Sequence, residues 1–167
     1  MDPDRRALLT GAFLRRSPPR RSPRLPGPRP PVLLDEPAVC AGCETRVCAT
    51  ACGEGIVAWD EAAKAPYLDF TLGGCTFCGE CVRACPHAAE APPLRRLGTA
   101  VLDAARCMAW NGVVCMSCRF PCRERAIMAD GRGRPVVIES RCTGCGACIG
   151  PCPVAAMSVQ APGAEGS

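Results

Sequence analysis

The cysteines of this chain occur in runs whose spacing suits the binding of metal. One run reads Cys-x2-Cys-x2-Cys-x3-Cys-Pro and consists of Cys142, Cys145, Cys148, Cys152 and Pro153. In bacterial proteins this spacing holds [4Fe–4S] clusters, with three thiolates on one cube of iron and sulfide and the fourth on a neighbouring cube. The proline keeps the chain from continuing as a helix after the last cysteine. The chemistry predicted from these residues is that of iron–sulfur clusters.

The same run occurs a second time without interruption, as Cys75, Cys78, Cys81, Cys85 and Pro86. A single intact copy is already a strong signal, and two copies leave little room for chance. In the later copy Gly144 and Gly146 stand between the cysteines. Without side chains they let backbone N–H groups approach the sulfur atoms, and such contacts help to set the reduction potential of a cluster.

Two further quartets of cysteines are spaced more loosely. They comprise Cys40, Cys43, Cys48 and Cys52, and then Cys107, Cys115, Cys118 and Cys122. Gly53 and Arg123 stand where the intact runs have proline. The longer spacers remain compatible with a cluster, because the entropy cost of closing a loop grows slowly with its length.

In two-cluster ferredoxins the fourth cysteine of each run binds the cluster of the other run. Applied here, this crossing uses all sixteen cysteines for four clusters. The predicted ligand sets are Cys40, Cys43 and Cys48 with Cys85; Cys75, Cys78 and Cys81 with Cys52; Cys107, Cys115 and Cys118 with Cys152; and Cys142, Cys145 and Cys148 with Cys122.

Zinc is the competing metal, because Zn²⁺ is also bound by four cysteines, often as separated Cys-x2-Cys pairs. Runs of three or four cysteines followed by proline favour iron–sulfur clusters over such pairs. His87 is the only histidine and follows Pro86 directly. Since the cysteines already complete the ligand sets, we expect His87 to be a loop residue near a cluster and not a ligand.

Sixteen cysteines in 167 residues would also suit a disulfide-rich secreted protein. We do not expect export. Arg5-Arg6 resembles the start of a twin-arginine signal, but the apolar stretch over residues 7–14 is short, ends in Arg15-Arg16 and has no small-residue cleavage site after it. No stretch approaches the ~20 apolar residues of a membrane span. The prediction is a cytoplasmic protein, in which clustered cysteines bind metal.

The chain contains an internal duplication. Cys40, Cys75 and the rest of that run recur 67 residues later, beginning with Cys107 and Cys142. A repeat at constant offset indicates two copies of one structural unit. We therefore expect an α+β fold made of two bacterial two-[4Fe–4S] ferredoxin-like units at residues 38–92 and 93–160. An arm at residues 1–37 and a tail at 161–167 are predicted to be largely disordered.

Each unit is predicted to contain a short β-hairpin between its two quartets. The first joins residues 56–60 and 66–70, and the second joins residues 126–129 and 135–139 through an Asp-Gly turn. A helical turn is expected in each intact run, at residues 80–84 and 147–150. Further short strands are expected at residues 101–102 and 157–159, and a short helix at residues 4–14. Only 4% of residues are aromatic, so the clusters themselves are expected to fill much of the interior.

The arm carries most of the positive charge. Residues 1–31 contain eight arginines against Asp2 and Asp4, whereas the remainder has two more acidic than basic residues. The proline-rich part, residues 17–31, can be neither helix nor central strand. The arm is either a solvated tail or a docking segment for an acidic partner or for the cluster-bearing body. Nucleic-acid binding is not expected, because no aromatic stacking residues are interleaved with the arginines.

The remaining residues do not suggest catalysis. No nucleophile–base pair, phosphate-binding loop or pair of carboxylates stands out, and we predict that the protein is not an enzyme. The larger side chains are expected to fill the core or to shield clusters; they are Trp59, Tyr67, Phe70, Met108, Trp110, Met116 and Met128.

The chain resembles the NapF family of ferredoxin-type accessory proteins of the periplasmic nitrate reductase system. The resemblance covers nearly the whole chain and rests on Arg5-Arg6-x-Leu-Leu-Thr-Gly11, the arginine- and proline-rich lead to Pro31, and the four quartets. The seven-residue spacer between Cys107 and Cys115 is the most family-specific mark. The first quartet departs from the pattern, with four residues between Cys43 and Cys48 where two are expected.

This resemblance implies a cytoplasmic protein that binds four [4Fe–4S] clusters and contacts the precursor of the nitrate-reductase catalytic subunit before export. It implies a role in maturation of that subunit, including assembly of its iron–sulfur cluster. The alternative is a ferredoxin-type electron carrier that donates electrons to a redox enzyme. Both hypotheses use the same fold and the same clusters.

Overall fold

The computed structural model describes residues 27, 28, 30, 37–88 and 96–161. In this part of the chain the helices are single turns: the 3-10 helix η3 (Pro37–Gly42), α2 (Val47–Thr50) and α3 (Glu80–Arg83). The strands form three two-stranded antiparallel sheets. They pair β1 (Val57–Asp60) with β2 (Ala65–Leu68), β3 (Thr99–Leu102) with β6 (Met157–Gln160), and β4 (Ile127–Ala129) with β5 (Pro135–Val137).

Both predicted hairpins are confirmed, and an aspartate shapes the turn of each. The carboxylate of Asp60 accepts hydrogen bonds from the backbone N–H groups of Ala62 and Ala63, at 2.8 and 3.0 Å. Asp130 accepts them from Arg132 and Arg134, at 2.9 and 2.8 Å. An aspartate that bonds the backbone two residues ahead favours a turn, so local chemistry sets both hairpins.

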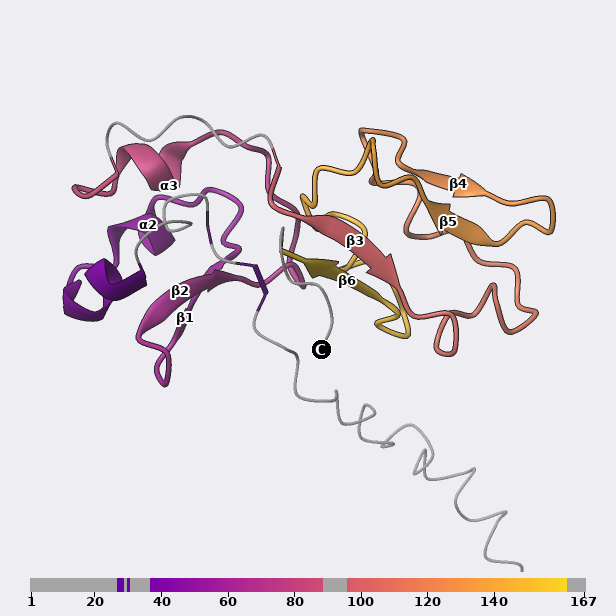
Figure 1. Ribbon diagram of the computed structural model, residues 1–167, viewed down its shortest axis with the longest axis horizontal. Coiled ribbons are helices and arrows are strands. Elements are labelled where there is room, and N and C mark those ends of the chain that lie inside the picture. The colour runs from indigo at the N-terminus through magenta and orange to yellow at the C-terminus, as the bar shows by residue number, and fades with distance from the viewer. Residues whose placement is uncertain (1–26, 29, 31–36, 89–95, 162–167) are drawn as a thin grey trace, which may run out of the picture.

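The third sheet ties together the two ends of the second unit. Strand β3 precedes the third quartet and β6 follows the fourth, and Leu102 pairs with Met157. Both strands lie where the sequence predicted them, each one or two residues longer. In Figure 1 this pair lies between the β1–β2 hairpin with its neighbouring helices and the β4–β5 hairpin at the far end.

The two intact runs differ in their helical content. The predicted helical turn at residues 80–84 is confirmed as α3. Residues 147–150 form a turn and not a helix. Gly150 precedes Pro151, and a residue before proline is disfavoured in helical conformation, which accounts for the difference. Helices η3 and α2, within the first quartet, were not predicted.

Two small apolar cores hold the elements together. The first contains Ile56, Leu68 and Phe70, with Cys48 buried among them. The second contains Ile127 and Met157, together with the buried Cys118 and Cys148. Several more cysteines pack against both cores, as expected for a chain with few large side chains. The partly buried Ile149 packs against both cores and so links them.

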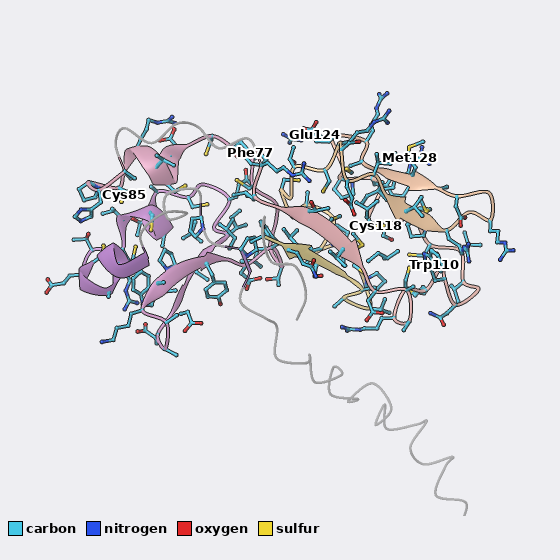
Figure 2. All side chains as sticks on the ribbon, viewed as in Figure 1. Phe77, Cys85, Trp110, Cys118, Glu124 and Met128 are labelled. Atoms are coloured by element: carbon cyan, nitrogen blue, oxygen red, sulfur yellow. The ribbon has the colours of Figure 1, made fainter. Side chains whose placement is uncertain are left out.

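The two units contact each other through their intact cysteine runs. The backbone N–H of Cys75 donates to the carbonyl of Cys145 at 2.7 Å. Within the second unit, the N–H of Leu97 donates to the carbonyl of Thr143 at 2.8 Å. Leu97 is buried in the first core although it follows the first unit in sequence. Figure 2 places Phe77 near the middle of the molecule, between Cys85 in one half and Cys118 in the other.

Four residues of the predicted arm, at positions 27, 28, 30 and 37, lie within the described part of the chain. The N–H of Leu68 in β2 donates to the carbonyl of Pro28 at 2.9 Å, and Pro30 is fully buried. Here the chain is packed on β2, so these residues are ordered within an arm that was predicted to be largely disordered. The remainder of the arm with the predicted helix at 4–14, residues 89–95 and tail residues 162–167 lie outside the described residues. Among the described helices, none has the length and hydropathy needed to cross a membrane.

Candidate metal centre

All sixteen cysteines lie among the described residues, and none forms a disulfide. Five are buried, Cys78 is exposed and the others are partly buried. In the described part of the chain, no three side chains of His, Cys, Asp or Glu converge tightly enough to hold a single metal ion. The buried cysteines are Cys40, Cys48, Cys107, Cys118 and Cys148.

The third quartet surrounds an open cavity. About 300 Å³ of space, part of it open to solvent, is lined by Cys107, Cys115, Cys118 and, from the fourth quartet, Cys152. These four are one of the predicted crossing sets, brought together by folding. Leu102 of β3 and Met157 of β6 are among the apolar residues that complete the wall. Burial, with the neighbouring thiolates of Cys152 and Cys107, raises the pKa of Cys118 to about 11.

The first two quartets also approach each other through their fourth cysteines. Burial raises the pKa of Cys48, and the nearby thiolates of Cys85 and Cys43 raise it further. Burial raises the pKa of Cys81 to about 11, with contributions from Cys75 and Cys52. The structure therefore brings Cys85 near the first quartet and Cys52 near the second, as the crossing hypothesis requires. The ligand sets themselves stay predictions.

The fourth quartet has one buried cysteine, Cys148. Burial raises the pKa of Cys148 to about 12, and the thiolates of Cys145 and Cys142 add to the shift. Cys122 packs against the same apolar core as Cys142 and Cys148. Thiols with such high pKa values are protonated at neutral pH without metal. Because a metal centre binds the thiolate, loading of these sites releases protons.

Backbone N–H groups point at four of the cysteine sulfur atoms. Ala126 donates to Cys122 and Ala156 to Cys152, each at 3.2 Å. The other two bonds run from Ala100 to Cys142 at 3.2 Å and from Phe77 to Cys75 at 3.4 Å. These bonds stabilise thiolate and are among the features that set the potential of a bound cluster. The donor set, apolar surroundings and N–H···S bonds all fit [4Fe–4S] clusters.

A residue in the left-handed backbone conformation follows three of the four quartets. In two of them this conformation orients the next backbone N–H toward the sulfur of the fourth cysteine. The residue three positions after the fourth cysteine has a positive φ at Gly55 (63°), Arg125 (49°) and Ala155 (49°). After Arg125 and Ala155, the next residue donates its N–H to the cysteine sulfur. Side-chain-bearing residues rarely adopt this conformation, so the bend is imposed by the surrounding structure.

Ala155→Gly is expected to stabilise the loaded protein. Ala in the left-handed region costs about 1–2 kcal/mol, and glycine removes that cost while adding some entropy to the unfolded chain. A net gain of about 1 kcal/mol corresponds to a rise of about 2–4 °C in the melting temperature. Differential scanning calorimetry under anaerobic conditions measures this change. A lower melting temperature would contradict the argument, and Ala58→Gly, in the middle of β1, provides a control expected to destabilise.

The two intact runs share a left-handed backbone conformation at two equivalent positions. Phe77 and Gly144 occupy equivalent positions and have φ values of 57° and 70°. Gly79 and Gly146, also equivalent, have φ values of 76° and 77°. The duplication seen in the cysteine spacing therefore extends to the conformation of the loops.

The seven-residue spacer of the third quartet is held by Asn111. Its side-chain amide donates to the carbonyl groups of Ala104, Ala105 and Cys107, at 3.2, 3.1 and 2.8 Å. Gly112 follows with a φ of 84° and completes the turn. Sequence reasoning did not single out Asn111, although an Asn-Gly pair is a recognisable turn signal.

An arginine stacks on Trp110, which lies in the spacer of the third quartet. The guanidinium of Arg134 lies 4.0 Å from the ring centroid of Trp110, and the Trp110 indole N–H donates to the carbonyl of Pro135 at 3.1 Å. Arg134 is fixed in turn by Asp130, with its Nε 2.8 Å from that carboxylate. These hydrogen bonds lower the pKa of Asp130 to about 2. Trp110 was predicted to fill the core or to shield a cluster, and its contact with Arg134 was not predicted.

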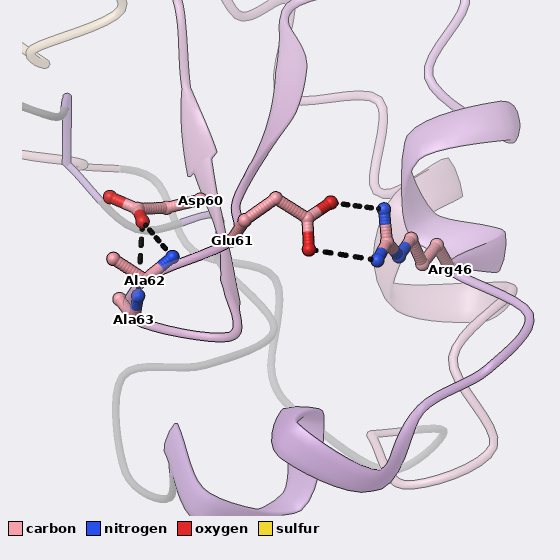
Figure 3. A network of polar contacts seen from close by, with 5 residues as sticks. All are labelled: Arg46, Asp60, Glu61, Ala62 and Ala63. Atoms are coloured by element: carbon pink, nitrogen blue, oxygen red, sulfur yellow. Dashed lines mark hydrogen bonds and ion pairs between the residues drawn. The ribbon is translucent and has the colours of Figure 1, made fainter.

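A second arginine fixes the long spacer of the first quartet. Arg46 lies between Cys43 and Cys48, and Figure 3 shows its two bonds to Glu61 in the β1–β2 turn, at 2.9 and 3.3 Å. Its guanidinium also lies 4.4 Å from the ring centroid of Trp59. The backbone N–H of Arg46 and the hydroxyl of Thr45 lower the pKa of Cys43. The spacer that departs from the family pattern is thereby tied to the hairpin.

Arg46→Ala is expected to loosen the first cluster selectively. The variant removes an exposed ion pair and a cation–π contact, together worth about 1 kcal/mol, or about fivefold in the rate of cluster loss. Iron release to a chelator should show a faster first phase of about four iron atoms per chain. Arg132→Ala, an exposed arginine of the other hairpin, is the matched control. Equal release from both variants would contradict a role for Arg46.

Comparisons with known proteins agree with this site. Residues 39–89 match the family described as 4Fe-4S dicluster domain, and residues 135–158 match the 4Fe-4S binding domain. The chain is 32% identical over 170 residues to the ferredoxin-type protein NapF of Escherichia coli K12, covering 96% of both chains. It is 30% identical over 159 residues to the methylamine utilization ferredoxin-type protein MauM of Methylophilus methylotrophus, covering 79% of this chain and 69% of that relative.

These matches extend over both cysteine-rich units and the region before them. The two 4Fe-4S domains and the sixteen cysteines fit four [4Fe–4S] clusters. The chain belongs to the NapF family of ferredoxin-type iron–sulfur proteins.

Proposed function

We propose that this protein is an iron–sulfur accessory protein that assists maturation of the catalytic subunit of a periplasmic nitrate reductase. In this proposal it acts in the cytoplasm, on the precursor of that subunit, and supports assembly of the precursor's iron–sulfur cluster. The observation that carries the proposal is the 32% identity to NapF, which covers 96% of both chains.

The sixteen cysteines are proposed as the ligands of the four clusters, in the crossing sets given above. When bound, each cluster accepts or releases one electron at a time. The protein supplies the thiolates, and the N–H groups of Ala100, Ala126 and Ala156 stabilise their negative charge. The loose quartets favour assembly over storage of electrons, because a longer spacer between ligands constrains its cluster less and lets it leave more readily.

Exposed apolar residues beside the third quartet support contact with a protein partner. Val114, directly before Cys115, is fully exposed, and Phe120, between Cys118 and Cys122, is 88% exposed. Arg119 and Arg123 flank this stretch and give it a positive charge. An acidic partner surface with an apolar centre would complement these residues.

The second candidate function is electron transfer to a redox enzyme. It is supported by the N–H···S bonds at both intact runs, which suit centres with defined potentials. Maturation and electron transfer differ in what passes to the partner. In maturation the partner gains iron and sulfide, whereas in electron transfer it gains electrons only.

One experiment separates these functions. The loaded protein is mixed anaerobically with the apo precursor, the two are separated, and iron, sulfide and redox state of the precursor are measured. Maturation predicts that the precursor gains about four iron and four sulfide from the loaded protein but not from the same amounts of free iron and sulfide. In a parallel mixture with precursor that already holds its cluster, reduction of the precursor without any gain of iron identifies the electron carrier. If there is neither a complex nor any transfer, the proposed partner is wrong.

The arm can be tested separately, since the structure shows where to cut. Deletion of residues 1–26 removes seven arginines but leaves Pro28 on β2. We expect weaker binding to the precursor, a smaller salt dependence of that binding and an unchanged iron content. Substituting Pro28 would not be a clean alternative, because it would disturb the body. Unchanged affinity of the deletion variant would exclude a docking role for residues 1–26.

A further inference from the structure

The two ferredoxin units meet along a close backbone contact, which we call the seam. It consists of the bond from the Cys75 N–H to the Cys145 carbonyl, at 2.7 Å, and the approach of Gly74 to Ala147. A Cβ added to Gly74 would lie 2.7–2.8 Å from Cβ, Cα and N of Ala147, closer than real Cβ atoms come. The seam therefore requires glycine at this position and leaves no room between the loops.

Further contacts keep the same two loops together. A Cβ at Gly146 would lie 2.1 Å from the ring of Phe70, which is 97% buried in the first core. Gly150 lies close to the carbonyl of Thr71, because a Cβ added at Gly150 would lie 3.1 Å from that oxygen. The loop at residues 142–150 is thus seated directly on the segment at residues 70–75. The two units are therefore in direct contact through these loops and are not joined by the connecting segment alone.

The loops that form the seam are both intact cysteine runs. With the ligand sets proposed above, on which this inference rests, the seam joins the centre of Cys75, Cys78 and Cys81 to that of Cys142, Cys145 and Cys148. The crossing cysteines join each of these inner centres to an outer one. Figure 2 is consistent with this order, because Cys85 and Cys118, ligands of the two outer centres, lie in opposite halves of the molecule.

We propose that the four clusters form a single row and that the seam is the electron contact between the two units. An electron given by a low-potential one-electron donor at one outer centre crosses from loop 75–81 to loop 142–148. The donor centre is oxidised by one electron, the acceptor centre is reduced by one, and no proton or covalent bond changes. The protein then has two separate ends, one for a donor and one for an acceptor.

The arrangement of loose and intact quartets agrees with such a row. The two intact runs, with their tight spacers, are inner, and the two quartets with long spacers are outer. The outer quartets are also those that carry the exposed residues Val114 and Phe120 on one side and the Arg46–Glu61 pair on the other. Partners can therefore reach the ends of the row without touching the seam.

A matched pair of neighbouring glycines tests the proposal. Gly74→Val forces the seam apart, whereas a Cβ at Gly73 would make only ordinary contacts at 3.8 and 3.9 Å, so Gly73→Val is the control. Both proteins are loaded, their iron and sulfide are counted, and they are reduced with dithionite for electron paramagnetic resonance. Magnetic coupling between the two reduced clusters of one unit broadens the resonance lines in both variants. Coupling between clusters of different units adds further line broadening, which should be present in wild type and Gly73→Val and lost in Gly74→Val.

Hydrogen exchange shows whether the seam exists and whether it has opened. The amide of Cys75, which bonds Cys145 across the seam, should be protected in the wild-type protein and in Gly73→Val, and should lose protection in Gly74→Val. Rapid exchange of this amide in the loaded wild-type protein overturns the seam without any variant, so the proposal stays testable even if Gly74→Val does not load. Broadening that persists after loss of protection overturns the electron contact. An iron count near four per chain in the wild type would instead refute the proposed ligand sets.

Discussion

An anaerobically prepared Cys85→Ser protein is expected to contain about twelve iron atoms per chain in place of about sixteen, because one of four clusters is lost. Cys85 follows Cys81 in sequence, but its thiolate lies near Cys48 of the first quartet. Removing it should therefore release the cluster of Cys40, Cys43 and Cys48 and leave the second cluster in place. The serine side chain is close in size, so the effect reports ligation and not packing.

The lost cluster can be identified by alkylation and peptide mass spectrometry. In Cys85→Ser the newly reactive thiols should be Cys40, Cys43 and Cys48. In Cys52→Ser, the reciprocal variant, they should be Cys75, Cys78 and Cys81. Alkylation of the second quartet in Cys85→Ser would show that each run holds its own cluster and that the crossing is wrong.

Gly146→Ala is expected to destabilise the loaded protein by about 2–5 kcal/mol. The left-handed φ of 77° costs alanine about 1–2 kcal/mol, and the clash with the buried ring of Phe70 adds about 1–3 kcal/mol of overpacking. Thermal unfolding followed by loss of visible absorbance measures the effect. The expected fall in melting temperature is several degrees for a chain of this size.

Gly79→Ala is the matched control for this substitution. Gly79 occupies the equivalent position with a φ of 76°, but its Cβ would meet only the flexible end of Arg83 at 3.2 Å. The expected cost is therefore about 1–2 kcal/mol, that of the backbone alone. If Gly146→Ala and Gly79→Ala lower the stability equally, Phe70 moves to accommodate the added methyl group and the units are less tightly packed than the Gly146–Phe70 contact indicates.

Much of the local structure could be predicted from sequence because it depends on neighbouring residues. The hairpins follow from Asp60 and Asp130, whose side chains bond the turn that comes next. The strand before Cys107 and the strand after Cys152 were recognisable as short apolar runs, and they pair as β3 and β6. The convergence of cysteines from different quartets was predictable because the spacing of such ligands is tightly constrained.

What sequence could not reveal depends on contacts between distant segments. The bond from Cys75 to Cys145 requires the relative placement of two units, and no local pattern encodes it. Arg46 and Arg134 were missed because an arginine acquires its role only from the tryptophan and carboxylate that folding brings beside it. Pro28 was assigned to a disordered arm because composition alone does not show that β2 offers its N–H groups there.

Ile149 and Leu97 belong to the second half of the chain but pack in the core of the first half, and this affects how the protein unfolds. A cut at the predicted boundary between residues 92 and 93 would separate the sequence repeats but not the cores, since both residues pack in the first core and belong to the second half. Each half expressed alone would expose apolar surface that the other normally covers. We therefore expect the two repeats to unfold as one cooperative unit, so that the intact protein melts in a single transition.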